Sequence, residues 1–210
     1  MSSCCSGSCG SQSSPPDNRY RRVLWVALFI NILMFGVELV SSMKAGSVSL
    51  LADSMDFLGD AGNYAVSLFV LGMATIWRSR AAYAKGVVMG VFGVLVLARA
   101  LWIGLGSHVP AAETMGIISL IAFAANGVVA LLLYAFRDGD ANMRSVWLCT
   151  RNDMIANLAV LLAAIGVFGT KAGWPDIAVA SVMAFLGLSA ARDIIGRARS
   201  ELATITVPVR

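Results

Sequence analysis

The chain has 210 residues, of which 58% are apolar and only 13% are charged, and its mean hydropathy is +0.78. A soluble domain of this length carries about a quarter charged residues. The composition therefore excludes an ordinary soluble globular protein and indicates one that lies in lipid. The net charge of +4 does not indicate a nucleic-acid partner, because the basic residues cluster at the ends of apolar runs.

The first 18 residues are polar and rich in Ser, Gly and Cys. They contain no apolar core of the kind that a secretory signal needs, and the first hydrophobic run begins near Val23. We expect residues 1–18 to be a disordered cytoplasmic tail in which Cys4, Cys5 and Cys9 are reduced. Three thiols so close together suggest capture of a soft metal ion, a lipidation site, or a tail without a function of its own.

Six apolar runs follow, each of about twenty residues or more and so long enough to cross a bilayer as a helix. They fall at 20–42, 47–76, 83–105, 113–136, 143–169 and 174–197. Turn-forming residues separate them, for example at Lys44–Ser47, Arg78–Arg80 and Lys171–Pro175. Continuous apolarity of this length excludes a membrane barrel, whose strands alternate. The sequence predicts an all-α membrane protein with a six-helix transmembrane domain at 19–199 and a short tail at 200–210.

The basic residues indicate the orientation of the chain in the membrane. Twelve lie at the two ends of the chain and in the second and fourth connections, against two, Lys44 and Lys171, in the other three connections. The twelve are Arg19, Arg21, Arg22, Arg78, Arg80, Lys85, Arg137, Arg144, Arg192, Arg197, Arg199 and Arg210. Cytoplasmic loops carry the excess of Lys and Arg, so we expect both termini to be cytoplasmic.

The second apolar run contains three carboxylates, Asp53, Asp56 and Asp60. A charged carboxylate near the centre of a bilayer costs about 2.5–3.5 kcal/mol, so these side chains must face protein, water or a cation. Asp56 and Asp60 are four residues apart and share one helix face. Asp53 lies about one turn earlier, and we expect it to support this pair or the entry path rather than to bind a metal directly.

The fifth apolar run carries Cys149, Asp153 and Asn157 at spacings of four. In antiparallel helices, Asp56 and Asp60 lie about 14 and 20 Å from one surface, and Cys149 and Asp153 about 9 and 15 Å from the other. These depths overlap in a core about 30 Å thick. Four oxygen and sulfur donors there predict a tetrahedral Zn²⁺ or Cd²⁺ site. The alternatives are a hydrogen-bonded carboxylate cluster that ties helices together, and a cysteine that is only a small buried side chain.

One segment makes the chain recognisable. Residues 46–60, GSVSLLADSMDFLGD, closely resemble the second-helix signature of the cation diffusion facilitator family of divalent-metal/proton antiporters. Asn31 and Glu38 in the first helix, Asn126 in the fourth, and Trp174–Asp176 at the start of the sixth also fit this family. The resemblance covers almost all of the apolar part of the chain.

The resemblance implies that the second and fifth helices each supply two ligands four residues apart. By position, these are Asp56, Asp60, Cys149 and Asp153. The family usually has His where this chain has Cys149, which leaves the thiolate, a water, Asn157 or Asn152 as the fourth ligand. The resemblance also implies a homodimer. We expect an integral protein of the bacterial cytoplasmic membrane. The family's His-rich loop and cytoplasmic C-terminal domain are absent from this sequence, which we interpret as a minimal member.

The expected function is export of a divalent metal ion from the cytoplasm in exchange for protons, by alternating access. Metal binding needs deprotonated ligands and so displaces protons. Zn²⁺ is the first choice of cargo and Cd²⁺ the next, while Co²⁺, Fe²⁺ and Mn²⁺ also suit a carboxylate-rich site. No cofactor is expected. Glu38, near the outer end of the first helix, suits an exit path or proton relay, or a hydrogen bond that packs helices.

Two other functional classes are weaker interpretations. A proton-coupled exporter of organic cations also uses buried acids, but it needs several aromatic side chains around its cargo. Only Phe57, Tyr64 and Trp147 lie near the acids of the second and fifth helices. No nucleophile–base pair or histidine cluster indicates an enzyme, and we expect a transporter.

Overall fold

The computed structural model of the chain describes residues 18–69, 75–106, 109–136 and 141–206. These ranges contain helices and no strand, as the sequence predicts. The helices are α1 (Asn18–Ala45), α2 (Val48–Phe69), α3 (Thr75–Gly104), α4 (Ala112–Tyr134), α5 (Ala141–Thr170) and α6 (Trp174–Thr206).

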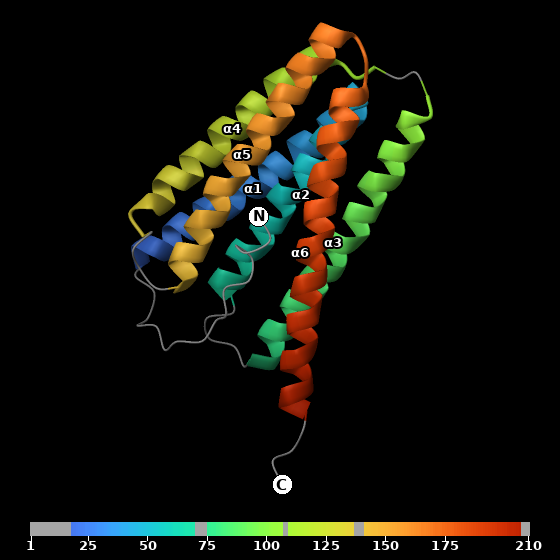
Figure 1. Cartoon of the computed structure of the whole chain (residues 1–210). Coiled ribbons are helices and arrows are strands. Elements are labelled where there is room, and N and C mark those ends of the chain that lie inside the picture. Colours follow the sequence, from blue (N-terminus) through green and yellow to red (C-terminus); the bar gives the residue numbers. More distant parts are fainter. Residues whose placement is uncertain (1–17, 70–74, 107–108, 137–140, 207–210) are drawn as a thin grey trace.

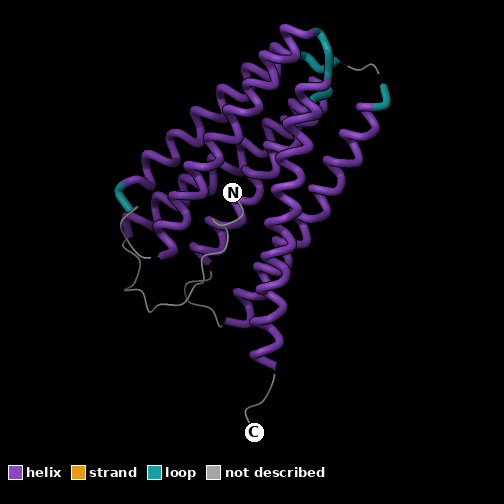
Figure 2. Tube along the Cα trace, viewed as in Figure 1, coloured by secondary structure: helices purple, strands orange, loops and turns teal. Residues whose placement is uncertain are grey.

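The helices run alternately up and down, joined by short connections (Figures 1 and 2). Helices α1, α2, α4 and α5 form a four-helix group, in which α1 contacts α2 and α4, and α5 contacts α4 and α2. Helices α3 and α6 pack along each other beside this group, and both also contact α2 (Figure 1). The start of α1 and the end of α6 lie at the same end of the molecule.

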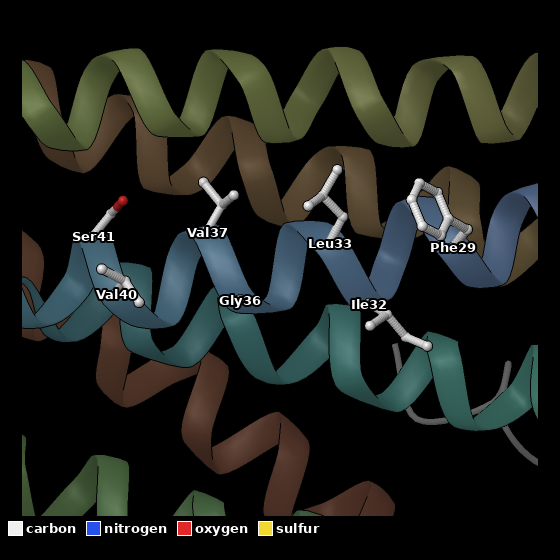
Figure 3. Close-up of a pocket in the computed structure, with 7 residues that line it drawn as sticks. All are labelled: Phe29, Ile32, Leu33, Gly36, Val37, Val40 and Ser41. Atoms are coloured by element: carbon white, nitrogen blue, oxygen red, sulfur yellow. The ribbon is translucent and has the colours of Figure 1, made fainter.

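Five of the helices are long and apolar enough to cross a membrane. The qualifying segments are Asn18–Ala45, Ser79–Gly104, Ala112–Tyr134, Asp153–Thr170 and Trp174–Ala203. Helix α2 has 22 residues and carries three aspartates. Large apolar side chains project outward from the other helices, as expected for contact with lipid. Figure 3 shows an outward apolar groove along α1, lined by Phe29, Ile32, Leu33, Gly36, Val37, Val40 and Ser41.

The start of the third helix differs from the prediction. The sequence suggests a turn at Arg78–Arg80 and a helix from residue 83, but α3 already begins at Thr75. Arginine is a good helix former, so it interrupts the apolar run without interrupting the helix. In the same way, α6 continues to Thr206, beyond the apolar run that ends at 197. Hydropathy marks the part of a helix that lies in lipid, not the part that projects from it.

A tight turn joins α1 to α2 at the predicted place. Gly46 adopts a positive φ of 67°, and the Ser47 N–H donates to the Ser42 carbonyl at 3.1 Å, which closes α1 as a Schellman motif. Ser47 then caps α2, because its hydroxyl accepts the Leu50 N–H at 3.1 Å. The pair of helices is therefore a rigid hairpin, which fixes the register between the residues of α1 and α2.

The start of α2 is also held by a carboxylate from α6. Asp176 is buried, and its Oδ2 accepts the Val48 N–H at 2.8 Å. Its Oδ1 accepts the Ser49 N–H at 3.0 Å and the hydroxyls of Ser47 and Ser49 at 2.7 and 2.6 Å. A negative charge at a helix N-terminus satisfies amide groups that have no partner within the helix. Asp176 thus joins the α3–α6 pair to the four-helix group.

Helices α3 and α6 approach closely through glycines. A Cβ added at Gly86 would lie 2.8 Å from Ile195 Cγ1, and one at Gly93 would lie 2.8 Å from Leu188 Cγ. Small residues allow helix backbones to come together in lipid, where helix association depends on packing. At the far end of this pair, the Ser79 hydroxyl donates to Glu201 at 2.6 Å.

Candidate metal site

The structure brings one carboxylate of α2 and one of α5 into direct interaction. Asp60 is 6% exposed, and its carboxyl group meets that of Asp153. The Tyr64 hydroxyl donates to Asp60 Oδ2 at 3.1 Å and lies 2.7 Å from Thr150 Oγ1. Because the tyrosine proton is directed to Asp60, the Thr150 hydroxyl is the donor to Tyr64. Two acids and two hydroxyls therefore connect α2 to α5 about halfway along α2.

Asp56 lies one turn before Asp60 and borders a different space. It lines a small cavity of about 20 Å³ between α2, α3 and α6, which is room for about one water molecule or one ion. Three methionines line the same cavity: Met55 from α2, Met89 from α3 and Met183 from α6. Thioether sulfurs are weak acceptors and soft ligands. Asp56 thus stands at the boundary between the four-helix group and the α3–α6 pair.

The predicted ligand set is only partly described. Cys149 belongs to α5, one turn before Asp153, but its side chain lies outside the described residues, as do Cys4, Cys5 and Cys9. Among the described side chains, no three of the types His, Cys, Asp and Glu are grouped closely enough to hold a metal ion. The direct interaction that the structure provides is the one between Asp60 and Asp153, which the matched depths of the two helices anticipate.

The Asn157 side chain interacts with Asp53 and Asn126 rather than with Asp60 and Asp153. Its Nδ2 lies 2.9 Å from both carboxylate oxygens of Asp53, and its Oδ1 accepts from Asn126 Nδ2 at 3.0 Å. All three side chains are buried. The Asn157 oxygen is therefore already used in a hydrogen bond, which weighs against Asn157 as the fourth metal ligand in this conformation. The side chain of Asn152, the other amide candidate, is not among the described ones.

Asp53 and Glu38 lie next to each other, on the side of the site nearer to the α1–α2 turn at Gly46. Both are fully buried, and the Glu38 carboxyl group faces Asp53. Asp53 therefore accepts from Asn157 and faces Glu38, while Asp60 interacts with Asp153. The three aspartates of α2 have three different surroundings, although their spacing in the sequence groups them on neighbouring faces.

A cation that the sequence does not predict lies near Asp60. Lys85 of α3 crosses α2 at Gly62, where an added Cβ would lie 3.5 Å from Lys85 Cδ. Its ammonium group donates to the Asn63 side-chain oxygen and acts electrostatically on Asp60. Nothing in the local sequence pairs Lys85 with α2, since the contact depends on how α3 packs. Tyr64 could have been found, because it follows Asp60 by four residues.

Comparison with known proteins agrees with this architecture. The family described as "Cation efflux transmembrane domain" matches residues 24–203. A cadmium, cobalt and zinc/H⁺-K⁺ antiporter of Bacillus velezensis is 25% identical over 182 residues, which cover 80% of this chain and 58% of the relative. A proton-coupled zinc antiporter of Mus musculus is 24% identical over 191 residues, 76% of this chain and 50% of the relative.

A plant relative matches a shorter stretch. Metal tolerance protein 1 of Oryza sativa is 32% identical over 98 residues, which cover 44% of this chain and 23% of that protein. The chain thus spans between about a quarter and three fifths of the length of these curated relatives.

Proposed function

Since this chain belongs to the cation diffusion facilitator (cation efflux) family, we propose that it carries divalent metal ions out of the cytoplasm in exchange for protons. The observation that carries the proposal is the direct interaction of Asp60 with Asp153 between two helices of a membrane bundle. Two neighbouring acids, of which Asp60 is buried and Asp153 partly buried, bind either a metal ion or protons, and binding of one displaces the other. The antiporter names of the Bacillus and mouse relatives support the same exchange.

The proposed metal ligands are Asp56, Asp60, Cys149 and Asp153, two from each helix. A site divided in this way between α2 and α5 forms when the two helices bring their ligands together and loosens when they move apart. This gives a simple basis for alternating access. In the described conformation Asp60 meets Asp153, whereas Asp56 borders the cavity toward α3 and α6.

Lys85 supplies a positive charge that belongs to the protein. Its ammonium group binds Asn63 and lies close enough to Asp60 to act on its charge. In the proposed cycle this cation partly compensates Asp60 when no metal is bound. An arriving divalent ion carries twice the charge of the Lys85 ammonium group and competes with that group for Asp60.

We further propose six membrane crossings with both termini in the cytoplasm. The start of α1 and the end of α6 lie at one end of the bundle. Most of the basic residues belong to the two ends of the chain and to the second and fourth connections, and such an excess is typical of the cytoplasmic side. Helix α2 completes the six proposed crossings, and its buried aspartates, Asp53 and Asp60, are covered by the neighbouring helices.

Zn²⁺ is the proposed first cargo, with Cd²⁺ next. A thiolate in place of the usual imidazole, and three thioether sulfurs beside Asp56, favour the softer of the two ions. Three carboxylates among four ligands keep the site suitable for Zn²⁺.

Transport in proteoliposomes with a pH-sensitive dye inside tests the proposal. Zn²⁺ should drive proton movement in the wild-type protein, and Asp60→Asn or Asp153→Asn should lower the rate about 100-fold or more, since even changes around metal ligands cost 10–100-fold. Asp193→Asn, at an exposed position of α6, is the matched control and should transport normally. Full flux in both site variants, or transport of tetraphenylphosphonium without transport of Zn²⁺, would refute the proposal.

A further inference from the structure

A second pair of buried carboxyl groups lies apart from the proposed metal pair. Glu38 of α1 and Asp53 of α2 are both fully buried. Glu38 lies about 12 Å and Asp53 about 10 Å along its helix from the turn at Gly46, whereas Asp60 lies about 10 Å farther along α2. The rigid hairpin at Gly46 holds the two residues at the same level. The pair therefore stands between the Asp60–Asp153 pair and the end of the molecule that carries this turn.

The two carboxyl groups differ in their hydrogen bonds. Asp53 has donors, because Asn157 Nδ2 lies 2.9 Å from each of its oxygens. In the described part of the chain, neither oxygen of Glu38 has a donor. The group that Glu38 faces is the Asp53 carboxyl. An ionised carboxylate only accepts hydrogen bonds, and a buried acceptor without a donor destabilises the fold, the more so if it is charged.

The surrounding charges do not compensate this pair. The other charged group close enough to act on Glu38 is Asp56, which is also acidic. From α5 the group that faces Asp53 is the neutral amide of Asn157, which is itself bound by Asn126 of α4. Among the described residues, no Lys, Arg or His acts on either carboxyl group. Two ionised acids in contact under these conditions would repel each other without a balancing cation.

We propose that Glu38 and Asp53 form a proton-binding site, in which Glu38 is a neutral acid that donates its O–H to the Asp53 carboxylate. One proton then satisfies every group at once. Glu38 gains an acceptor, and Asp53 receives Glu38 in addition to Asn157. The hydrogen-bonded chain Glu38–Asp53–Asn157–Asn126 runs through α1, α2, α5 and α4 in turn. Loss of the proton would leave two like charges between α1 and α2 and would loosen this connection.

Infrared spectroscopy of the metal-free protein in detergent tests the site directly. The wild-type spectrum at neutral pH should contain the carbonyl stretch of a protonated carboxylic acid, and Glu38→Gln should remove the intensity of one such group per chain. Glutamine keeps the shape of Glu38 and supplies an N–H donor to Asp53. Glu113→Gln, at an exposed position in the first turn of α4, is the matched control and should leave the band unchanged.

Asp53→Asn keeps the test decisive if Glu38→Gln does not fold. The asparagine removes the carboxylate that accepts the Glu38 proton, while burial still favours the neutral acid at Glu38, so the carbonyl band should shift in frequency. An unchanged band in both variants would overturn the proposal. So would loss of one bound Zn²⁺ per chain on Glu38→Gln with no change in the band, because the pair would then hold a metal ion.

The role of this proton in transport rests on the proposed function, but its presence does not. A protein that shows the Glu38 band and no Zn²⁺ flux would refute metal transport and leave the proton site intact. Zn²⁺ flux without the band would refute the proton site alone. If both hold, Glu38→Gln should still bind Zn²⁺, while an opposing pH gradient should accelerate its transport less than that of the wild type.

Discussion

The four-helix group and the α3–α6 pair are held together by different forces. In the four-helix group, buried polar side chains join the helices, as in the contacts of Asn157 with Asp53 and Asn126. In the α3–α6 pair, aliphatic side chains of α6 pack where α3 has glycine, at Gly86 and Gly93, and a hydrogen bond joins Ser79 to Glu201 at the far end. Both solutions are typical of helices in lipid, where polar groups and small residues replace the hydrophobic effect between helices.

Under the proposed function, this difference separates the part of the molecule that would bind ions from the part that supports it. Polar side chains are costly in a membrane helix, and in the described residues they concentrate between α1, α2, α4 and α5, where we propose that protons and metal ions bind. The α3–α6 pair packs against the four-helix group. It supplies one cation, Lys85, and two of the methionines near Asp56, Met89 and Met183. The contact between the two regions is made at α2, which belongs to the four-helix group and is capped from α6.

The largest effect is expected where the two regions are joined. Asp176→Ala removes the acceptor for two backbone amides and two hydroxyls at the start of α2. Because bonds to a charged acceptor are worth about 1.5–3 kcal/mol each and do not simply add, we expect a loss of about 3–5 kcal/mol in the free energy of unfolding. Denaturant unfolding in detergent, followed by circular dichroism, measures it. Asp193→Ala, at an exposed site of α6, should be neutral, and an equally neutral Asp176→Ala would contradict the joint described for Asp176.

The polar connection of the four-helix group should be the next most sensitive. Asn157→Leu removes both donors from Asp53 and the acceptor of Asn126. We expect a loss of about 2 kcal/mol, since hydrogen bonds inside membranes average well under this value singly but a charged acceptor is left behind. Thermal unfolding in detergent should show a clear decrease relative to Leu158→Ala, the exposed neighbour on α5. An unchanged midpoint would mean that the network contributes no stability.

The α3–α6 pair should respond to volume rather than to polarity. Gly86→Ala adds a Cβ 2.8 Å from Ile195 Cγ1, 3.1 Å from Ile194 Cγ2 and 3.4 Å from the Ala191 carbonyl oxygen. Overpacking of this kind costs about 1–3 kcal/mol. Gly196→Ala on α6 meets nothing within 4 Å and should be neutral or slightly stabilising, since alanine favours a helix by up to about 1 kcal/mol over glycine. Equal unfolding midpoints for the two variants would show that α3 and α6 are not closely packed at Gly86.

The smallest effect is expected at the boundary cavity. Met89→Leu conserves volume, so stability should change by less than about 1.5 kcal/mol. It removes one soft sulfur from the cavity beside Asp56, and the preference for Cd²⁺ over Zn²⁺ in a competition transport assay should fall modestly. Met115→Leu, buried at the start of α4, is the control. An unchanged ratio would mean that the methionines only fill space.

The helices were predictable because apolar runs of membrane length are a strong signal, and the meeting of Asp60 with Asp153 follows from counting residues in antiparallel helices. The start of α3 was not predictable, because arginines interrupt an apolar run but continue a helix. The cap at Asp176 and the bond from Asn157 to Asp53 each join residues more than a hundred positions apart, and no local pattern reveals such partners. The role of Cys149 stays a prediction, since its side chain is not described.

Zn²⁺ binding at equilibrium tests most directly whether α2 and α5 build one metal site. Equilibrium dialysis of the detergent-purified protein should find Zn²⁺ bound at a site that disappears in both Asp60→Asn and Asp153→Asn and remains in Asp193→Asn. Cys149→Ser in the same experiment shows whether the thiolate contributes, by a weaker affinity than the wild type. Wild-type binding retained in either Asp60→Asn or Asp153→Asn would contradict a site shared between the two helices.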